Sequence, residues 1–374
     1  MRLLSRNAEA LFWLARYLER GASLARVIEM QSSFGGQDQE NGWNWLLTLY
    51  ADEARFKEKH EVSSPSIIGF YVSEMANGGS IRSSIHWARE NARALRPFIP
   101  LEMWVQLNAF HTAVEAYTAE DISPAELPRT CAEIRAGCLA QIGIAESTLF
   151  RDEGYLFFKL GMMIERADQT SRLLDVKFAQ VTANGPSVDP ANEFVFWTTI
   201  LRTAAAYQVF HRLETGSANP DRVARFLILN PSHPRSIGFC VREISEALHQ
   251  LRGGFHLSRA SSALEACEVL MEGMQTAGTD PKLSSRLHVF NDWVQGSLMT
   301  LTSAIQQAFF VATAPPEPRE PRTQEQTQSP QSQTQSTSSE SATQSTSPPT
   351  QTRNDTKSPS KPRGASKKQD PSQS

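Results

Sequence analysis

The chain has 374 residues, of which 40% are hydrophobic and 21% are charged, and its formal net charge at pH 7 is -3. Its length suits two ordinary domains or one large helical domain. A mildly acidic chain argues against a surface that binds duplex nucleic acid, because such a surface needs a stripe of basic side chains.

The N-terminal segment predicts a helix and no signal peptide, because Arg6 and Glu9 interrupt its apolar run. From there to about Ala314 the pattern is typical of helix after helix, and strand signals are nearly absent. Several prolines follow a Ser, Asp or Asn, a combination that favours a helix start because the preceding side chain can cap the first turn. These predicted starts are Ser64-Pro65, Ser123-Pro124, Asp189-Pro190, Asn219-Pro220 and Asp280-Pro281.

One charged motif occurs twice. Residues 12–29 (FWLARYLERGASLARVIE) align with residues 158–175 (FKLGMMIERADQTSRLLD). A shared helical period explains matching apolar positions, but it does not explain identical charged residues. The matched charged residues are Glu19 with Glu165, Arg20 with Arg166, and Arg26 with Arg172.

A second match follows in the same order, between residues 67–85 and residues 223–241. The sequence therefore predicts an all-α fold of two tandem duplicated helical-bundle units that pack together, residues 1–153 and 154–314. Residues 315–374 contain no Val, Ile, Leu, Met, Phe, Trp, Tyr or Cys, so we expect a disordered, low-complexity tail. We interpret this tail as a solubilising spacer, with a weak tether to RNA or to an acidic protein as the alternative.

The four cysteines have no metal-ligand or CxxC spacing, so they are interpreted as buried free thiols in a reducing compartment, the cytoplasm. No apolar run of about 18 residues occurs, and we expect no membrane span. Common nucleotide-binding, metalloprotease and serine-hydrolase motifs are absent from the sequence. Only one Glu-x-x-His occurs, Glu246 to His249, whereas a di-iron bundle needs two. The sequence thus predicts no metal and no cofactor, and it favours a non-catalytic role without deciding the question.

On a helical wheel Glu19 and Arg26 lie at the edge of the apolar face of the first helix, while Arg20 points away from it. Glu165 and Arg172 take the equivalent places in the second copy. Charges beside apolar side chains lose hydration, so each needs an opposite charge. Glu19 and Arg26 are roughly 10 Å apart along the axis, so their partners must come from another helix or a ligand. We expect Glu19 to pair with Arg172, and Glu165 with Arg26.

Two interpretations of these charges stay open. They are buried structural ion pairs, or they form an anion site in which Arg16, Arg20 or Arg26 grips a carboxylate or a phosphate. Similarly, Arg235 and Ser236 precede a predicted helix, where Ser236 either caps the helix or helps its amides to hold an anion.

The segments that contain these charged residues also resemble a known family. The segment LLSRNAEALFWLARYLERGASLARVIE resembles the N-terminal signature of the bacterial alpha-E family, an alpha-helical domain with a Glu-Arg motif. The segments LGMMIERADQTSRLLDVKF, LILNPSHPRSIGFC and ARENARALR are similar to further blocks of that family. The last of these places Arg89, Arg93 and Arg96 on one helical face, which is either a solvated surface or a contact for an acidic partner.

The resemblance implies partners rather than a reaction. Alpha-E genes typically accompany, or are fused to, those of a circularly permuted ATP-grasp protein and a transglutaminase-like cysteine peptidase, which suggests a system that forms and cleaves amide bonds. We therefore expect a helical interaction or accessory protein of such a system. The alternatives are an enzyme, or a protein that binds an amine or a carboxylate at a buried Glu/Arg site, and a purely structural adaptor. The oligomeric state stays open, and a homo-oligomer is compatible with the sequence.

Overall fold

The computed structural model describes residues 3–34, 42–183, 190–214, 218–280 and 283–311. Within these ranges the protein consists of helices and contains no strand, which confirms the predicted all-α class. The tail that the sequence predicts to be disordered, residues 315–374, lies outside the described residues. No helix in the described part of the chain has the length and apolar character needed to cross a membrane.

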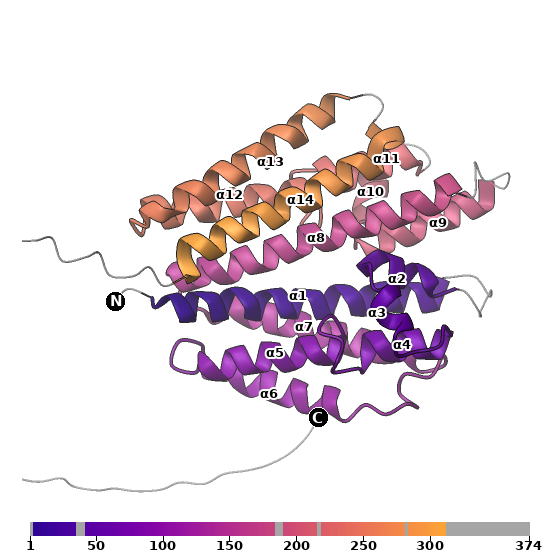
Figure 1. Cartoon of the computed structure of the whole chain (residues 1–374), viewed down its shortest axis with the longest axis horizontal. Coiled ribbons are helices and arrows are strands. Elements are labelled where there is room, and N and C mark those ends of the chain that lie inside the picture. Colours follow the sequence, from indigo (N-terminus) through magenta and orange to yellow (C-terminus); the bar gives the residue numbers. More distant parts are fainter. Residues whose placement is uncertain (1–2, 35–41, 184–189, 215–217, 281–282, 312–374) are drawn as a thin grey trace, which may run out of the picture. The chain divides into compact units, whose positions relative to one another are not determined.

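Fourteen α-helices follow one another along the described chain (Figure 1). The first seven are α1 (Ser5–Phe34), α2 (Asn44–Tyr50), α3 (Glu53–Lys57), α4 (Ser64–Val72), α5 (Ile81–Ala94), α6 (Leu101–Glu115) and α7 (Leu127–Thr148). The next seven are α8 (Glu153–Ala183), α9 (Pro190–Thr203), α10 (Tyr207–Leu213), α11 (Pro220–Leu229), α12 (Ile237–Gly253), α13 (Ser261–Thr279) and α14 (Leu287–Ile305). Shorter turns are η1 (Ser258–Ala260), η2 (Leu283–Arg286) and the π-helical η3 (Gln306–Phe310).

Helix α1 is the central element. It packs against α8 on one side and against α5 and α7 on the other, and α8 packs in turn against α12 and α14 (Figure 1). The apolar face expected from the helical wheel is buried, including Leu14, Leu18 and Ala22. Because several helices surround α1, many of its side chains outside this face are also partly covered, and this determines the arrangement of the charged site.

Two apolar cores meet along α1. The larger combines side chains from both predicted halves, such as Leu14 of α1, Phe158 of α8 and Leu248 of α12. The smaller lies among α1 to α7, and it includes Phe56 of α3 and Tyr71 of α4. The helical region thus forms one compact unit. That its two halves, divided at residue 153, are copies of one ancestral unit stays a prediction.

One proline-marked helix start shows the expected cap, and a second is capped one residue earlier than expected. Asn219 accepts a hydrogen bond from the backbone N–H of Arg222 at 3.0 Å, and α11 begins at Pro220. Helix α4 carries its proline in the first turn, but the capping residue is Ser63, one position earlier than Ser64. Side-chain oxygens satisfy N–H groups that have no partner within the helix.

The predicted start at Ser123-Pro124 is wrong. These residues lie in a series of turns, and α7 begins only at Leu127, with Pro128 as the proline of its first turn. A second proline four residues along the chain thus marks the true start. Helix α9 begins at Pro190 as expected, but Asp189 and Pro281 lie outside the described residues.

Candidate functional site

The site lies next to a close contact between α1 and α8. A Cβ atom placed on Gly161 of α8 would lie only 2.1 Å from the backbone oxygen of Phe12 of α1, so a side chain there would force the helices apart. Glycine permits this backbone contact. One to two turns further along, the same contact brings together the Glu-Arg motifs of the two helices.

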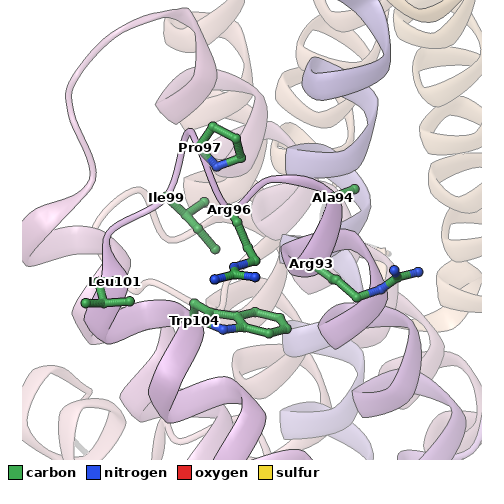
Figure 2. A pocket seen from close by; sticks show the side chains of 7 residues that line it. All are labelled: Arg93, Ala94, Arg96, Pro97, Ile99, Leu101 and Trp104. Atoms are coloured by element: carbon green, nitrogen blue, oxygen red, sulfur yellow. The ribbon is translucent and has the colours of Figure 1, made fainter.

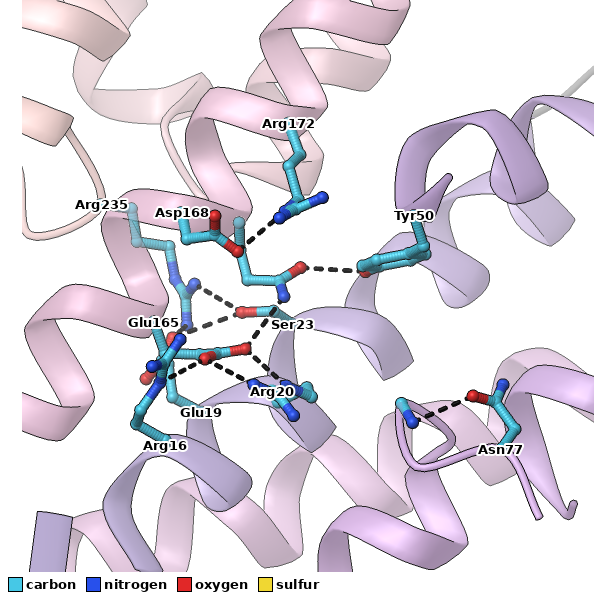
Figure 3. Close-up of polar contacts among 12 residues, drawn as sticks. Arg16, Glu19, Arg20, Ser23, Tyr50, Asn77, Glu165, Asp168, Arg172 and Arg235 are labelled. Carbon is cyan, nitrogen blue, oxygen red and sulfur yellow. Dashed lines mark hydrogen bonds and ion pairs between the residues drawn. The ribbon is translucent and has the colours of Figure 1, made fainter. Parts of the chain in front are cut away.

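Glu165 of α8 is completely buried, and it faces two arginines of α1 (Figure 3). Its carboxylate accepts a hydrogen bond from Nε of Arg16 at 2.8 Å. It also accepts two from Arg20, from Nε at 2.7 Å and from Nη2 at 3.0 Å. Gln169, one turn along α8, donates a further bond at 3.1 Å. Two charged partners and an amide therefore compensate the lost hydration of this carboxylate.

Glu19 of α1 is buried in the same way, with partners from α8 and from the segment before α12. Nη2 of Arg166 lies 2.9 Å from one carboxylate oxygen, and Nη2 of Arg235 lies 2.8 Å from the other. Ser23, one turn along α1, donates at 3.4 Å. Each Glu-Arg pair is thus exchanged across the interface, since the acid of either helix binds the arginine of the other.

Both carboxylates are held in the ionised form. Burial alone would raise the pKa of Glu165, but Arg20 and Arg16 outweigh burial, and the pKa is well below its ordinary value. The pKa of Glu19 is also lowered, because Arg166 and Arg235 overcome the effect of burial. A carboxylate with a lowered pKa is a weak base, so neither group is well matched to general-base catalysis near neutral pH.

The pairing predicted from the helical wheel is wrong in its partners. Arg172 binds Asp168, one turn before it on α8, at 2.8 Å. Nε of Arg26 is buried and has no hydrogen-bond partner among the described residues. Arg20, which the wheel directs away from the core, instead binds Glu165. The reason is that α8 covers the flank of α1, so a position outside its apolar face still meets another helix.

Positive charge exceeds negative charge in this centre. Its carboxylates are Glu19, Glu165 and Asp168, and its guanidinium groups are Arg16, Arg20, Arg26, Arg166, Arg172 and Arg235. Burial, together with repulsion from Arg235 and Arg135, lowers the pKa of Arg26 to about 10. The pKa of Arg235 is also lowered, because burial and Arg166 outweigh the attraction of Glu19. An anion would relieve this excess.

A cavity of about 300 Å³ opens beside the centre, between α1, α8 and α14. Arg16, Arg20 and Arg172 line it together with Asp168. The α14 side is closed by Leu298, Met299, Thr302 and Ser303, and Gln306 follows at the end of that helix. Arg16 and Arg20, the two arginines that bind Glu165, thus also face a cavity with several further polar groups.

A chain of hydrogen bonds that no sequence pattern above predicts enters the site from α2. The hydroxyl of Tyr50 donates to Oε1 of Gln169 at 2.9 Å, and the amide of Gln169 donates to Glu165 (Figure 3). Gln169 lies four residues after Glu165 on one helix, a spacing that places side chains together and could have indicated this contact. The position of Tyr50 could not be inferred in this way, since it depends on packing between distant segments.

The segment at Arg235 and Ser236 caps a helix and supplies an ion pair. Ser236 accepts a hydrogen bond from the backbone N–H of Phe239 at 3.1 Å, as Ser80 does from Ser83 at the start of α5. The guanidinium of Arg235 reaches Glu19 and therefore does not flank its own helix terminus. Capping, one of the two interpretations of Ser236, is thus confirmed.

The prediction that Arg89, Arg93 and Arg96 share one helical face is wrong for Arg96, because α5 ends at Ala94 and Arg96 lies in the turns that follow. The basic surface at this end of α5 forms a second site (Figure 2). Here a cavity of about 640 Å³ is lined by Arg93, Arg96 and Trp104, and the Arg96 guanidinium lies 5.4 Å from the Trp104 ring centre. Arg93 and Arg89 both form ion pairs with Glu90, at 2.7 and 2.6 Å. Intramolecular contacts thus neutralise part of this face.

The Glu-x-x-His motif of α12 forms no larger site. His249 is exposed, and its Nδ1 atom lies 2.9 Å from the backbone oxygen of Ser245. Glu246 accepts a hydrogen bond from Gln250 at 3.2 Å. In the part of the chain that the structure describes, neither residue belongs to a group of three metal-ligating side chains.

Comparison with known proteins gives the site a family context. Residues 3–310 match the Alpha-E family, described as a predicted alpha-helical domain with a conserved ER motif. Uncharacterised proteins of Mycobacterium bovis and Mycobacterium tuberculosis are 23% identical over 271 residues, a match that covers 67% of this chain and 30% of the mycobacterial proteins. No solved structure matches. The Glu-Arg motif that names the family is present on both α1 and α8, and the chain belongs to the Alpha-E family.

Proposed function

We propose that this protein is a non-catalytic accessory protein of an amide-bond-forming system, in which the Glu-Arg centre recognises a carboxylate. The observation that carries the proposal is the excess of guanidinium groups beside a cavity of about 300 Å³. Arg16, Arg20 and Arg172 line this cavity. Guanidinium groups suit this role because their planar donors match the two oxygens of a carboxylate.

A non-catalytic role agrees with the state of the buried acids. Both oxygens of Glu19 and of Glu165 accept bonds from arginine, and both pKa values are lowered. A general base works best when its pKa lies near the working pH. The acids therefore serve to hold α1, α8 and the start of α12 together, and they keep the arginines in place.

The resemblance of the sequence to the alpha-E family suggests which proteins are its partners. A circularly permuted ATP-grasp protein and a transglutaminase-like peptidase would form and cleave amide bonds, and a carboxylate is one of the two groups joined in an amide. We propose that the ATP-grasp protein, or the acceptor substrate that it modifies, presents this carboxylate to the cavity in the cytoplasm.

The test is binding between the full chain and a circularly permuted ATP-grasp protein from the same organism. We expect the two to co-elute in size-exclusion chromatography at micromolar concentrations, and Arg172→Ala to weaken binding about tenfold or more, which corresponds to about 1.4 kcal/mol. Arg225→Ala is the matched control, because Arg225 also pairs with an acid one turn before it and is similarly exposed. Separate elution of the wild-type proteins would remove the proposal.

A second candidate is a small-molecule carboxylate carrier, favoured by a cavity volume at the lower end of the range for ligand pockets. A short peptide with a free C-terminal carboxylate and the same peptide with an amidated terminus distinguish this from protein docking. Protection against thermal unfolding by the free peptide alone, without co-elution of the ATP-grasp protein, would favour the carrier. Loss of turnover in a folded Glu165→Gln variant would instead indicate an enzyme.

A further inference from the structure

Three potential metal ligands meet between α5 and α6, on helices that pack against each other. His86 comes from α5, whereas His111 and Glu115 lie one turn apart on α6. One ligand atom from each of the three residues lies within 4.8 Å of the other two. All three residues are half-buried.

We propose that His86, His111 and Glu115 bind a divalent transition-metal ion of the zinc type. Two imidazoles and one carboxylate are a donor set that suits zinc, and three protein ligands leave a fourth position for water or another ligand. Helical residues four apart lie on one face, so His111 and Glu115 form a natural pair, and His86 completes the set from the neighbouring helix.

The imidazole of His111 supports the assignment. Its Nε2 atom is buried and has no hydrogen-bond partner among the described residues. Oε1 of Glu115 lies 3.8 Å from it, which is too long for a hydrogen bond. A buried nitrogen without a partner is costly, and a metal ion between the two groups would satisfy both.

Arg82 orients the Glu115 carboxylate mainly through its Oε2 atom, so that Oε1 is less strongly bonded. Its shortest contact, 2.6 Å from Nη2, is to Oε2 of Glu115. Oε1, the oxygen nearest His111, accepts only a longer bond of 3.1 Å from Nε. Metal-binding carboxylates are commonly oriented by such outer partners. Arg82 therefore acts as a positioning residue for the site.

The separations between the ligand atoms are close to those of a tetrahedral zinc site. Zinc–nitrogen and zinc–oxygen bonds of about 2.0–2.2 Å in a tetrahedron place the ligand atoms about 3.3 Å apart. The His111–Glu115 separation of 3.8 Å is already close to this value. Rotation of half-buried side chains can supply the remaining change without moving the helices.

A second cluster, Asp175, His288 and Asp292, is a poorer candidate. It offers one imidazole, and His288 and Asp292 are both exposed. Nδ1 of His288 also lies 2.6 Å from Asp175, so one nitrogen is already engaged. In the described part of the chain, the α5–α6 cluster is the better match to a zinc-type donor set.

The test is titration of the untagged full chain with Co²⁺, followed by displacement with Zn²⁺. Residues 315–374 contain no His or Cys and so add no imidazole or thiolate. We expect one equivalent of Co²⁺ to give the visible absorption of a low-symmetry site, and one equivalent of Zn²⁺ to abolish it. Zn²⁺ should also raise the unfolding temperature, because it binds the folded chain alone.

Variants decide whether these residues are the ligands. His86→Asn and His111→Gln should each weaken Zn²⁺ binding by about tenfold or more, the lower end of what losing even an outer partner costs. His249→Gln is the control, since it removes an exposed histidine that belongs to neither cluster of potential metal ligands. Circular dichroism verifies the fold of each variant. Equal weakening by His249→Gln, unchanged binding in His111→Gln, or no stoichiometric binding in the wild type would each overturn the proposal.

Discussion

Arg20 of α1 donates two hydrogen bonds to Glu165 of α8, and the sequence neighbours of these residues repeat the contact in the opposite direction. Glu19, which precedes Arg20, binds Arg166, which follows Glu165. The two Glu-Arg dipeptides are therefore connected by two ion pairs of opposite polarity. A shift of α8 along α1 by one turn would break both pairs at once, so they fix the register of the two helices.

Removal of one acid should be strongly destabilising. In Glu165→Gln, Arg16 and Arg20 remain largely buried without their counter-charge. Breaking a buried pair in this way costs about 3–5 kcal/mol in the free energy of unfolding, measured by urea denaturation. The control is Glu268→Gln on the exposed side of α13, which should change it by less than about 0.5 kcal/mol. A similar loss in both variants would contradict the structural role of the pair.

Glu19 and Glu165 should also determine how the free energy of unfolding falls at low pH. Their pKa values are lowered in the folded chain, so the unfolded chain binds more protons as the pH falls. Their stabilisation is complete above about pH 4.3, the ordinary value of Glu, and is lost as the pH falls below it towards the folded values. Glu165→Gln should therefore show a shallower decline of unfolding free energy below that pH. An identical slope in wild type and variant would show that Glu165 does not contribute.

The close helix contact gives a third prediction. Gly161→Ala places a methyl group against the backbone of Phe12, which cannot move without separating α1 from α8. Overpacking of this kind costs about 1–3 kcal/mol, and more where the clash is with backbone. Gly143 of α7 is the matched control, because nothing lies within 4 Å of an added Cβ there. Gly143→Ala should raise the free energy of unfolding by up to about 1 kcal/mol.

The thiols should be unreactive in the folded protein. All four cysteines are free and buried, as the sequence predicted. Burial raises the pKa of Cys131, Cys240 and Cys267 to about 12, and it also raises that of Cys138. Because the thiolate is the reactive form, a thiol reagent at pH 8 should label native protein only as fast as it unfolds. Rapid labelling of any one of the four under native conditions would contradict this burial.

Sequence patterns were sufficient to predict the all-helical class. They also predicted that the buried acids need oppositely charged partners from elsewhere in the fold. The apolar face of α1 is buried as the helical wheel predicts, and the partners of Glu19 come from other elements, as expected. The identity of these partners could not be obtained in this way. A wheel describes one isolated helix, and Arg20 is largely covered because α8 packs over a flank that the wheel assigns to solvent.

The site on α5 and α6 illustrates the same limit. The spacing of His111 and Glu115 can be recognised in the sequence, because both lie on one helix. The third ligand, His86, is 25 residues away, and only the packing of the two helices brings it near. Whether the two halves of the chain superimpose as copies also stays a prediction, because matched motifs define equivalent residues but not equivalent folds.

The exchange of ion pairs has a consequence for synthesis on the ribosome. Glu165 is 145 residues beyond Arg20, so α1 leaves the exit tunnel long before its counter-charge is translated. At about 5–20 residues per second this delay is about 7–30 s. During that interval α5 and α7 are already available to cover one side of α1, whereas the side that packs against α8 stays open and Arg16 and Arg20 have no counter-charge. This side of the nascent N-terminal half is therefore the part of the molecule that a chaperone would have to protect.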